Sequence, residues 1–96
     1  MREQTIQKGL KKVMKVFNRM ENSKSMDDIQ EIVKITDKLL LEVNCYRNDE
    51  EGSPYYGEPD LYEIYAIKEG KSVDCATIDY TRNFESDVTY LLNCYV

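Results

Sequence analysis

The sequence predicts a single α+β domain in which an N-terminal antiparallel two-helix hairpin packs on a small antiparallel sheet. Three observations support this prediction. Apolar residues recur at helical spacing up to residue 41, alternating residues with a turn between them fill 61–80, and a chain of 96 residues is long enough for one domain only. An apolar fraction of 42% is ordinary for a globular protein and too high for a disordered one.

The first predicted helix spans residues 5–20. Its apolar residues recur at steps of four and three, and they are Ile6, Leu10, Val13, Phe17 and Met20. Most basic residues fall on the opposite side, namely Lys8, Lys11, Lys12, Lys15 and Arg19. We expect the apolar side to cover the core and the basic side to stay in water. A helix that binds a membrane surface or nucleic acid is the alternative.

The second predicted helix runs from Met26 to about Leu41, after a short polar connector. Ser25 and Asp28 have the spacing of a capping box. The predicted apolar stripe consists of Ile29, Ile32, Val33, Thr36, Leu39 and Leu40. A connector of this length predicts an antiparallel helix hairpin. The heptad-like spacing also allows this helix to pair with a second copy of itself, so a homodimer is the alternative arrangement.

The second part of the chain predicts the sheet. Leu61–Ile67 and Ser72–Tyr80 alternate around a turn at 68–71, which predicts a β-hairpin completed by one or two further strands. Residues 41–47 fit either a strand or a continued helix, and Val-Asn-Cys-Tyr favours the strand. Phe84–Val96 is equally ambiguous, and its Tyr, Val and Thr residues favour a strand.

Between these elements, residues 48–60 predict a long loop, because two Gly and two Pro exclude a regular element. Charge is divided unevenly around it. Residues 1–41 form a basic half of net charge +3, whereas residues 42–96 form an acidic half of net charge −8 that holds all eight tyrosines. The division predicts a molecule with two surfaces of opposite charge.

The composition excludes several kinds of chemistry. The chain has no histidine, so His-based triads, His metal sites and the commonest general base are excluded. No phosphate-binding glycine motif is present, and the acidic residues 49–51 lack the regular oxygen spacing of a calcium loop. A carboxylate pair such as Glu63 and Asp74 is the remaining catalytic alternative. We predict a protein that is not an enzyme and needs no metal or cofactor.

Three cysteines without paired spacing, Cys45, Cys75 and Cys94, predict reduced and mostly buried thiols. The N-terminal residues lack the apolar run of a signal peptide, and no stretch is long enough to span a membrane. The expected localisation is cytoplasmic.

Tyrosines interleaved with carboxylates predict a surface that binds a basic protein, because the rings supply contact area and the carboxylates pair with Arg or Lys. The predicted partner-binding residues are Asp49, Glu50, Glu51, Tyr55, Tyr56, Glu58, Asp60, Tyr62, Glu63, Tyr65 and Asp74. Tyr55, Tyr56 and the outward member of the Tyr62/Tyr65 pair are expected to be exposed. The same negative charge disfavours direct binding to nucleic acid.

We therefore expect a small acidic, non-catalytic protein-binding module. If the partner's basic site normally holds nucleic acid, the module would act as a decoy. Phages and mobile elements encode small acidic inhibitors, including anti-CRISPR proteins, and immunity proteins have similar size and charge; the analogy extends to size and charge only. The alternative function is a structural, self-associating module, in which the acidic half serves solubility or receives the basic helix of another copy.

Overall fold

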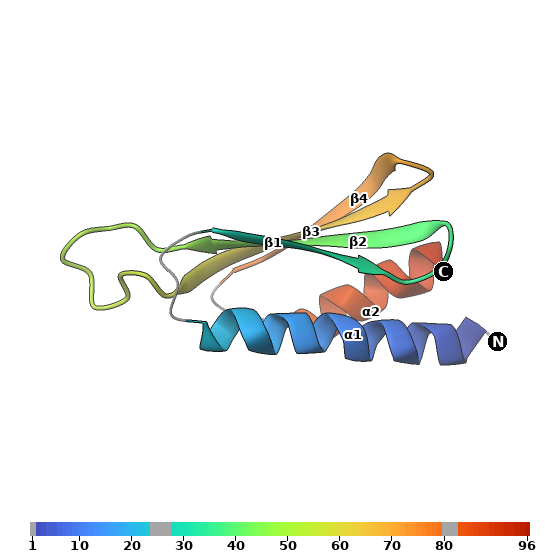
Figure 1. The fold of residues 1–96 in the computed structure, drawn as a ribbon, viewed down its shortest axis with the longest axis horizontal. Coiled ribbons are helices and arrows are strands. Elements are labelled where there is room, and N and C mark those ends of the chain that lie inside the picture. The colour runs from blue at the N-terminus through green and yellow to red at the C-terminus, as the bar shows by residue number, and fades with distance from the viewer. Residues whose placement is uncertain (1, 24–27, 80–82) are drawn as a thin grey trace.

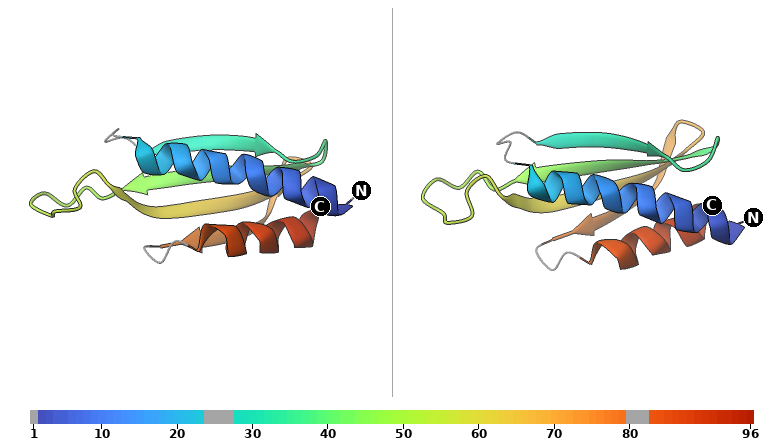
Figure 2. Two further views of the ribbon diagram at one scale, coloured as in Figure 1. Left: turned by 90° about the horizontal axis from the view of Figure 1, so that it is seen from below. Right: turned by 60° about the horizontal axis from the view of Figure 1, so that its bottom comes forward.

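Four consecutive antiparallel strands form one sheet, and both helices lie on the same side of it (Figure 1 and Figure 2). The computed structural model describes residues 2–23, 28–79 and 83–96. The elements in chain order are α1 (Arg2–Asn22), β1 (Ile29–Lys34), β2 (Leu39–Arg47), β3 (Pro59–Lys68), β4 (Lys71–Ile78) and α2 (Phe84–Tyr95). The strands lie side by side in the order β1-β2-β3-β4, each antiparallel to its neighbour. The α+β class is confirmed.

The sheet has one apolar side because its sequence alternates. In β2, Leu41, Val43 and Cys45 are fully buried against the helices, whereas Leu40 and Glu42 are half-buried on the other side. Successive side chains of a strand point to opposite faces, so this period-two pattern buries one face only. The helices supply the second layer of the core.

Three aromatic rings join the two helices to the sheet. Phe17 of α1 and Phe84 of α2 are stacked, with centroids 4.1 Å apart. The ring of Tyr62, from β3, meets both edge-on, at 5.2 Å from Phe17 and 5.0 Å from Phe84. Edge-to-face and offset contacts at these distances are favourable beyond the area they bury. The cluster therefore fixes both helices on one side of the sheet.

Gly9 lets α1 approach its neighbours closely. A Cβ atom at this position would lie 3.1 Å from Ile35 Cδ1 and 3.4 Å from Leu92 Cδ2. At the same end of the molecule, the Arg2 guanidinium donates hydrogen bonds to the backbone carbonyls of Asn93 and Val96. A cation at the C-terminal end of α2 satisfies carbonyls that have no partner within the helix.

Three local predictions are confirmed. The first helix is present and extends to Arg2–Asn22, residues 41–47 are in a strand, and the hairpin 61–80 corresponds to β3 and β4. Glu69 and Gly70 form its two-residue turn with φ angles of 52° and 78°. Both angles are positive, as in the type I′ turn that hairpins favour. Tyr80, at the end of the predicted second strand, lies outside the described residues.

The predicted helix from Met26 to Leu41 is wrong. Ile29–Lys34 and the first residues of β2 pair as antiparallel strands instead. Residues 29 and 33 share a face in both a helix and a strand, so the apolar spacing did not discriminate between them. The segment Ile-Val-Lys-Ile-Thr, in which every residue but the lysine is β-branched, favours extended structure. The helix hairpin, and a homodimer built on its seam, therefore lose their basis. Ser25 of the predicted capping box lies outside the described residues.

The predicted C-terminal strand is also wrong, because Phe84–Tyr95 is helical. Val88, Leu91 and Leu92 are fully buried at helical spacing, and this burial outweighs the strand preference of Tyr, Val and Thr. Asn83 does occupy the N-cap position, although its side chain makes no capping hydrogen bond. The second helix is therefore C-terminal.

Replacing Phe17 with Ala should lower the free energy of unfolding by about 3–5 kcal/mol, because a fully buried ring and its contacts to Phe84 of α2 and Tyr62 of β3 are lost. Urea denaturation of the purified variant measures this change. Tyr90→Ala is the matched control, since the Tyr90 ring is 58% exposed. A loss for Phe17→Ala no larger than that of the control would contradict the role given to the aromatic cluster.

Candidate partner-binding surface

The side of the sheet opposite the helices is uncovered, and we call it the open face. The strand register assigns to it Gln30, Ile32, Lys34, Leu40, Glu42, Asn44, Tyr46, Leu61, Glu63, Tyr65, Ile67, Cys75 and Thr77. Tyrosine, leucine and isoleucine side chains surround a polar centre on β2 and β3. An uncovered sheet face of this composition resembles the exposed surface of a protein interface more than a cavity for a small ligand.

Two carboxylates lie at the centre of the open face. Glu42 is opposite Tyr65 and Asn44 is opposite Glu63 in the β2–β3 register, so the two carboxylates are diagonal neighbours. The Asn44 amide donates to Glu42 Oε2 at 3.0 Å, and the Tyr65 hydroxyl donates to Glu63 Oε2. Both carboxylates are half-buried, and neither forms an ion pair within the described part of the chain. Their charge is thus held in place and left unneutralised.

The groups around these carboxylates resist ionisation. The hydrogen bond to Glu63 and the charge of that carboxylate raise the pKa of Tyr65 well above its usual value. Burial raises the pKa of Tyr46, and Glu63, Asp28 and Glu42 add to the shift. Burial and then Glu63 raise the pKa of the Cys75 thiol. Burial and the neighbouring carboxylates therefore favour the uncharged forms of these groups, and Cys75 stays a thiol with little nucleophilic character.

The acidic loop, residues 48–58, projects from one end of the sheet (Figure 1). Its base is closed by two backbone hydrogen bonds, from Asn48 N to Glu58 O at 2.9 Å and from Gly57 N to Asn48 O at 2.8 Å. The rings of Tyr55 and Tyr56 are 63% and 48% exposed, as predicted. The carboxylates of the loop are exposed too, and they are Asp49, Glu50, Glu51 and Glu58.

A buried arginine anchors this loop. The Arg47 side chain donates to Met20 O at 3.0 Å, to Ser23 O at 3.2 Å and to Gly57 O at 3.4 Å. Its backbone N–H donates to Asp28 Oδ1 at 3.0 Å. The guanidinium thus satisfies carbonyls at the C-terminal end of α1, where a cation is favoured, and ties them to the loop. Its Nε has no partner among the described residues.

The predicted partner-binding residues do not all meet at one surface. The structure brings Glu63 and Tyr65 together on the open face, leaves Asp60 exposed near the start of β3, and leaves the predicted loop residues exposed. Tyr62 is 1% exposed and belongs to the core, so its assignment to the surface is corrected. Asp74 is corrected as well, because it lies on the helix side of β4.

Asp74 and Glu63 cannot act as a pair of catalytic carboxylates. In the β3–β4 register, Glu63 is opposite Thr77 on the open face, whereas Asp74 is opposite Ala66 on the helix side. The Tyr95 hydroxyl donates to Asp74 Oδ2 at 2.9 Å, and this hydrogen bond raises the pKa of Tyr95 to about 12. The sheet separates the two carboxylates.

Sequence reasoning missed Glu42, Asn44, Tyr46 and Arg47. The alternation along residues 41–46 placed the first three on one strand face, but only the register with β3 brings that face to the centre of a surface. The sequence did not indicate that Arg47 is buried, because arginine is rarely buried. The expectation of mostly buried thiols is corrected, since Cys45 is buried but Cys75 and Cys94 are exposed.

Comparison with known protein families, with curated proteins and with solved structures gives no match to this chain. Neither helix is long and apolar enough to cross a membrane, as far as the chain is described. Within the same residues, no three His, Cys, Asp or Glu side chains are grouped so as to hold a metal ion.

Replacing Arg47 with Met should lower the free energy of unfolding by about 2–4 kcal/mol, because three backbone carbonyls lose the hydrogen bond that they accept from the guanidinium. Urea denaturation measures the loss, and hydrogen exchange should become faster at the amides of Asn48 and Gly57. Arg19→Met is the control: the Arg19–Glu31 ion pair is exposed, so we expect a loss below about 1 kcal/mol. Equal losses for the two variants would contradict the anchoring role of Arg47.

Replacing Glu63 with Gln should lower the pKa of Tyr65 toward the usual value of about 10, because the charge that disfavours the phenolate is removed. Absorbance at alkaline pH counts the tyrosines that ionise, and NMR of labelled tyrosines assigns the shift to Tyr65. Glu85→Gln, on α2, should leave the titration unchanged. An unaltered Tyr65 titration in Glu63→Gln would show that the hydrogen bond does not form in solution.

Proposed function

We propose that this chain is a small non-catalytic protein-binding module whose open face and acidic loop bind a basic surface of another protein. One observation carries the proposal. The carboxylates of Glu42 and Glu63 are half-buried at the centre of an uncovered sheet face, and no cation of the described chain neutralises them.

An arginine or lysine of a partner has three reasons to bind at this centre. The two carboxylates can accept charge-assisted hydrogen bonds, which are the stronger kind, and a guanidinium can donate two in parallel. The rings of Tyr46 and Tyr65 offer faces for cation–π contact. Leu61 and Ile67 add apolar area around the polar centre.

The acidic loop extends the same chemistry beyond the sheet. It carries four carboxylates and no cation, together with the exposed rings of Tyr55 and Tyr56. Exposed carboxylates at a rim accelerate the encounter with a basic partner, and exposed tyrosines supply contact area at low entropic cost. A polyanionic ligand such as nucleic acid would be repelled from both parts.

A narrower version of the proposal is a decoy that occupies a nucleic-acid-binding site on its partner, in the manner of small inhibitors from phages or mobile elements. It is supported by the acidic open face and loop, which would replace phosphate charge. Its test is competition: nucleic acid should displace the module from its partner, whereas an uncharged polymer should not.

The main proposal is tested by replacing Glu42 and Glu63 together with Gln. Immobilised wild-type protein should capture basic proteins from a lysate and release them at about 0.2–0.6 M salt, because the contacts are largely electrostatic. The double variant should bind the same purified partner at least about tenfold more weakly, since a desolvated ion pair is lost at each position.

Glu69→Gln/Glu85→Gln is the matched control, because it removes two exposed carboxylates that lie at the β3–β4 turn and on α2. This control should bind like the wild type. Equal weakening by both double variants would show that only net charge matters. Full binding by Glu42→Gln/Glu63→Gln would overturn the proposal.

A further inference from the structure

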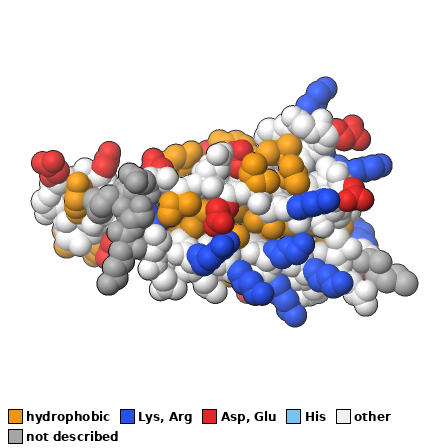
Figure 3. All heavy atoms as spheres, viewed as in Figure 1, with side chains coloured by type: hydrophobic (Ala, Val, Ile, Leu, Met, Phe, Trp, Pro, Cys, Tyr) orange, Lys and Arg blue, Asp and Glu red, His pale blue; other side chains and the backbone are white. Residues whose placement is uncertain are grey.

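A basic groove of about 660 Å³ lies between α1 and the edge strand β1. Its lining residues include the cations Lys12, Lys15 and Lys34, the carboxylate of Glu31, and the apolar Val16 and Ile32. Figure 3 shows Lys and Arg side chains gathered over α1 on this side of the molecule, with apolar atoms between them and the sheet. The groove therefore combines an apolar floor with a positively charged rim.

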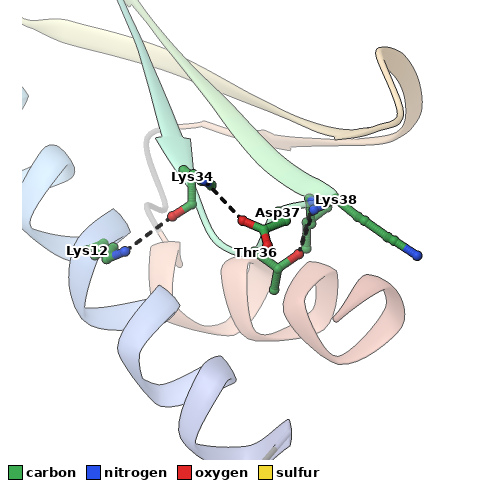
Figure 4. Close-up of polar contacts among 6 residues, drawn as sticks. Lys12, Lys34, Thr36, Asp37 and Lys38 are labelled. Carbon is green, nitrogen blue, oxygen red and sulfur yellow. Dashed lines mark hydrogen bonds and ion pairs between the residues drawn. The ribbon is translucent and has the colours of Figure 1, made fainter.

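Polar contacts hold the shape of the groove at one end. The Lys12 ammonium donates to the backbone carbonyl of Lys34 at 3.3 Å, and Lys34 forms an ion pair with Asp37 at 3.2 Å (Figure 4). The Thr36 hydroxyl accepts hydrogen bonds from the backbone N–H groups of Lys38 and Leu39, which fixes the adjoining turn. The first of these contacts joins α1 to β1.

The positive charge of the groove is only partly compensated. Arg19 pairs with Glu31 at 3.0 Å, and Lys34 pairs with Asp37. Lys15, and the neighbouring Lys8 and Lys11 on α1, form no ion pair with any described residue. At the same place Ile32 is 59% exposed, and β1 has a strand neighbour on one side only. An acidic, partly apolar segment fits this combination.

We propose that the basic groove receives the acidic loop, residues 48–58, of a second copy of this chain. The loop matches the groove in charge, with four carboxylates against the unpaired lysines, and in apolar contact, with Tyr55 and Tyr56 against Ile32 and Val33. The loop projects beyond the sheet and away from its own α1 (Figure 1 and Figure 2). It is therefore placed to contact the groove of another molecule and not the groove of its own chain.

The contact joins two different surfaces of the chain. It closes into a two-fold dimer if each copy inserts its loop into the other, and it continues head to tail if only one loop is inserted per pair. Either assembly is held largely by charge and must weaken with salt. The inference goes beyond the proposed function, although it uses the same acidic loop. Ile32 and Lys34 lie at the edge of the open face and also line the groove, whereas Glu42 and Glu63 at the centre of that face do not.

Sedimentation at about 50 mM and 500 mM salt tests the proposal. The wild type should associate in a concentration-dependent manner at low salt and become monomeric at high salt. Lys12→Glu/Lys15→Glu and Glu50→Lys/Glu51→Lys should each associate at least about tenfold more weakly. An equimolar mixture of the two variants should associate again, because each altered loop then meets an altered groove and each native loop a native groove.

Two controls separate the groove from other causes. Lys38→Glu/Lys71→Glu changes net charge equally at exposed lysines outside the groove and should associate like the wild type. Lys15→Glu alone spares the hydrogen bond of Lys12 and weakens association without loss of thermal stability. Glu42→Gln/Glu63→Gln should also associate normally, so failure of the proposed function and failure of this inference are distinguishable.

Three results would overturn the inference: a wild type that stays monomeric at low salt and millimolar concentration, an association that persists in both charge-reversed variants, or a mixture of the two variants that stays monomeric. Association that persists at high salt would overturn the inference as well, because a contact held largely by charge must weaken with salt.

Discussion

The stacked contact between Phe17 and Phe84, with Tyr62 edge-on to both, is the interaction on which the arrangement of this protein depends. It joins the N-terminal helix, the C-terminal helix and the third strand at one point of the core. Because both helices are held on one side, the alternating strands bury a single face. The open face is then left in contact with water, and its side chains are a mixture of tyrosine, leucine and carboxylate.

The fold separates two surfaces of opposite charge, which the uneven distribution of charge along the sequence had indicated. Basic residues lie along α1 and in the groove between α1 and β1. Glu42 and Glu63 lie on the open face, and the acidic loop lies beyond the end of the sheet. Arg47 connects the C-terminal end of α1 with the loop through backbone carbonyls. The buried Arg47 side chain therefore fixes the position of the loop. A projecting segment that is held in one position loses less conformational freedom when it binds a partner.

Prediction from sequence succeeded where one periodicity dominated. The helix at 5–20 and the hairpin around Glu69-Gly70 each show a single period with clear ends. It failed at 26–41 and 84–96, where apolar residues fit periods of 2 and 3.6 about equally and tertiary burial decides. The exposed tyrosines of the loop were predictable from its composition. The diagonal placement of Glu42 beside Glu63 depends on strand register, and the burial of Arg47 depends on where α1 ends, so neither is encoded locally.

The central claim is that the centre of the open face binds basic side chains. NMR titration of the labelled chain with an arginine-rich peptide tests it most directly, since every amide reports separately. We expect saturable shifts concentrated at Glu42, Glu63 and Tyr65, with smaller changes in the acidic loop and none at Glu85 on α2. Shifts of equal size at all exposed carboxylates, or shifts confined to the acidic loop with the open face unchanged, would contradict the claim.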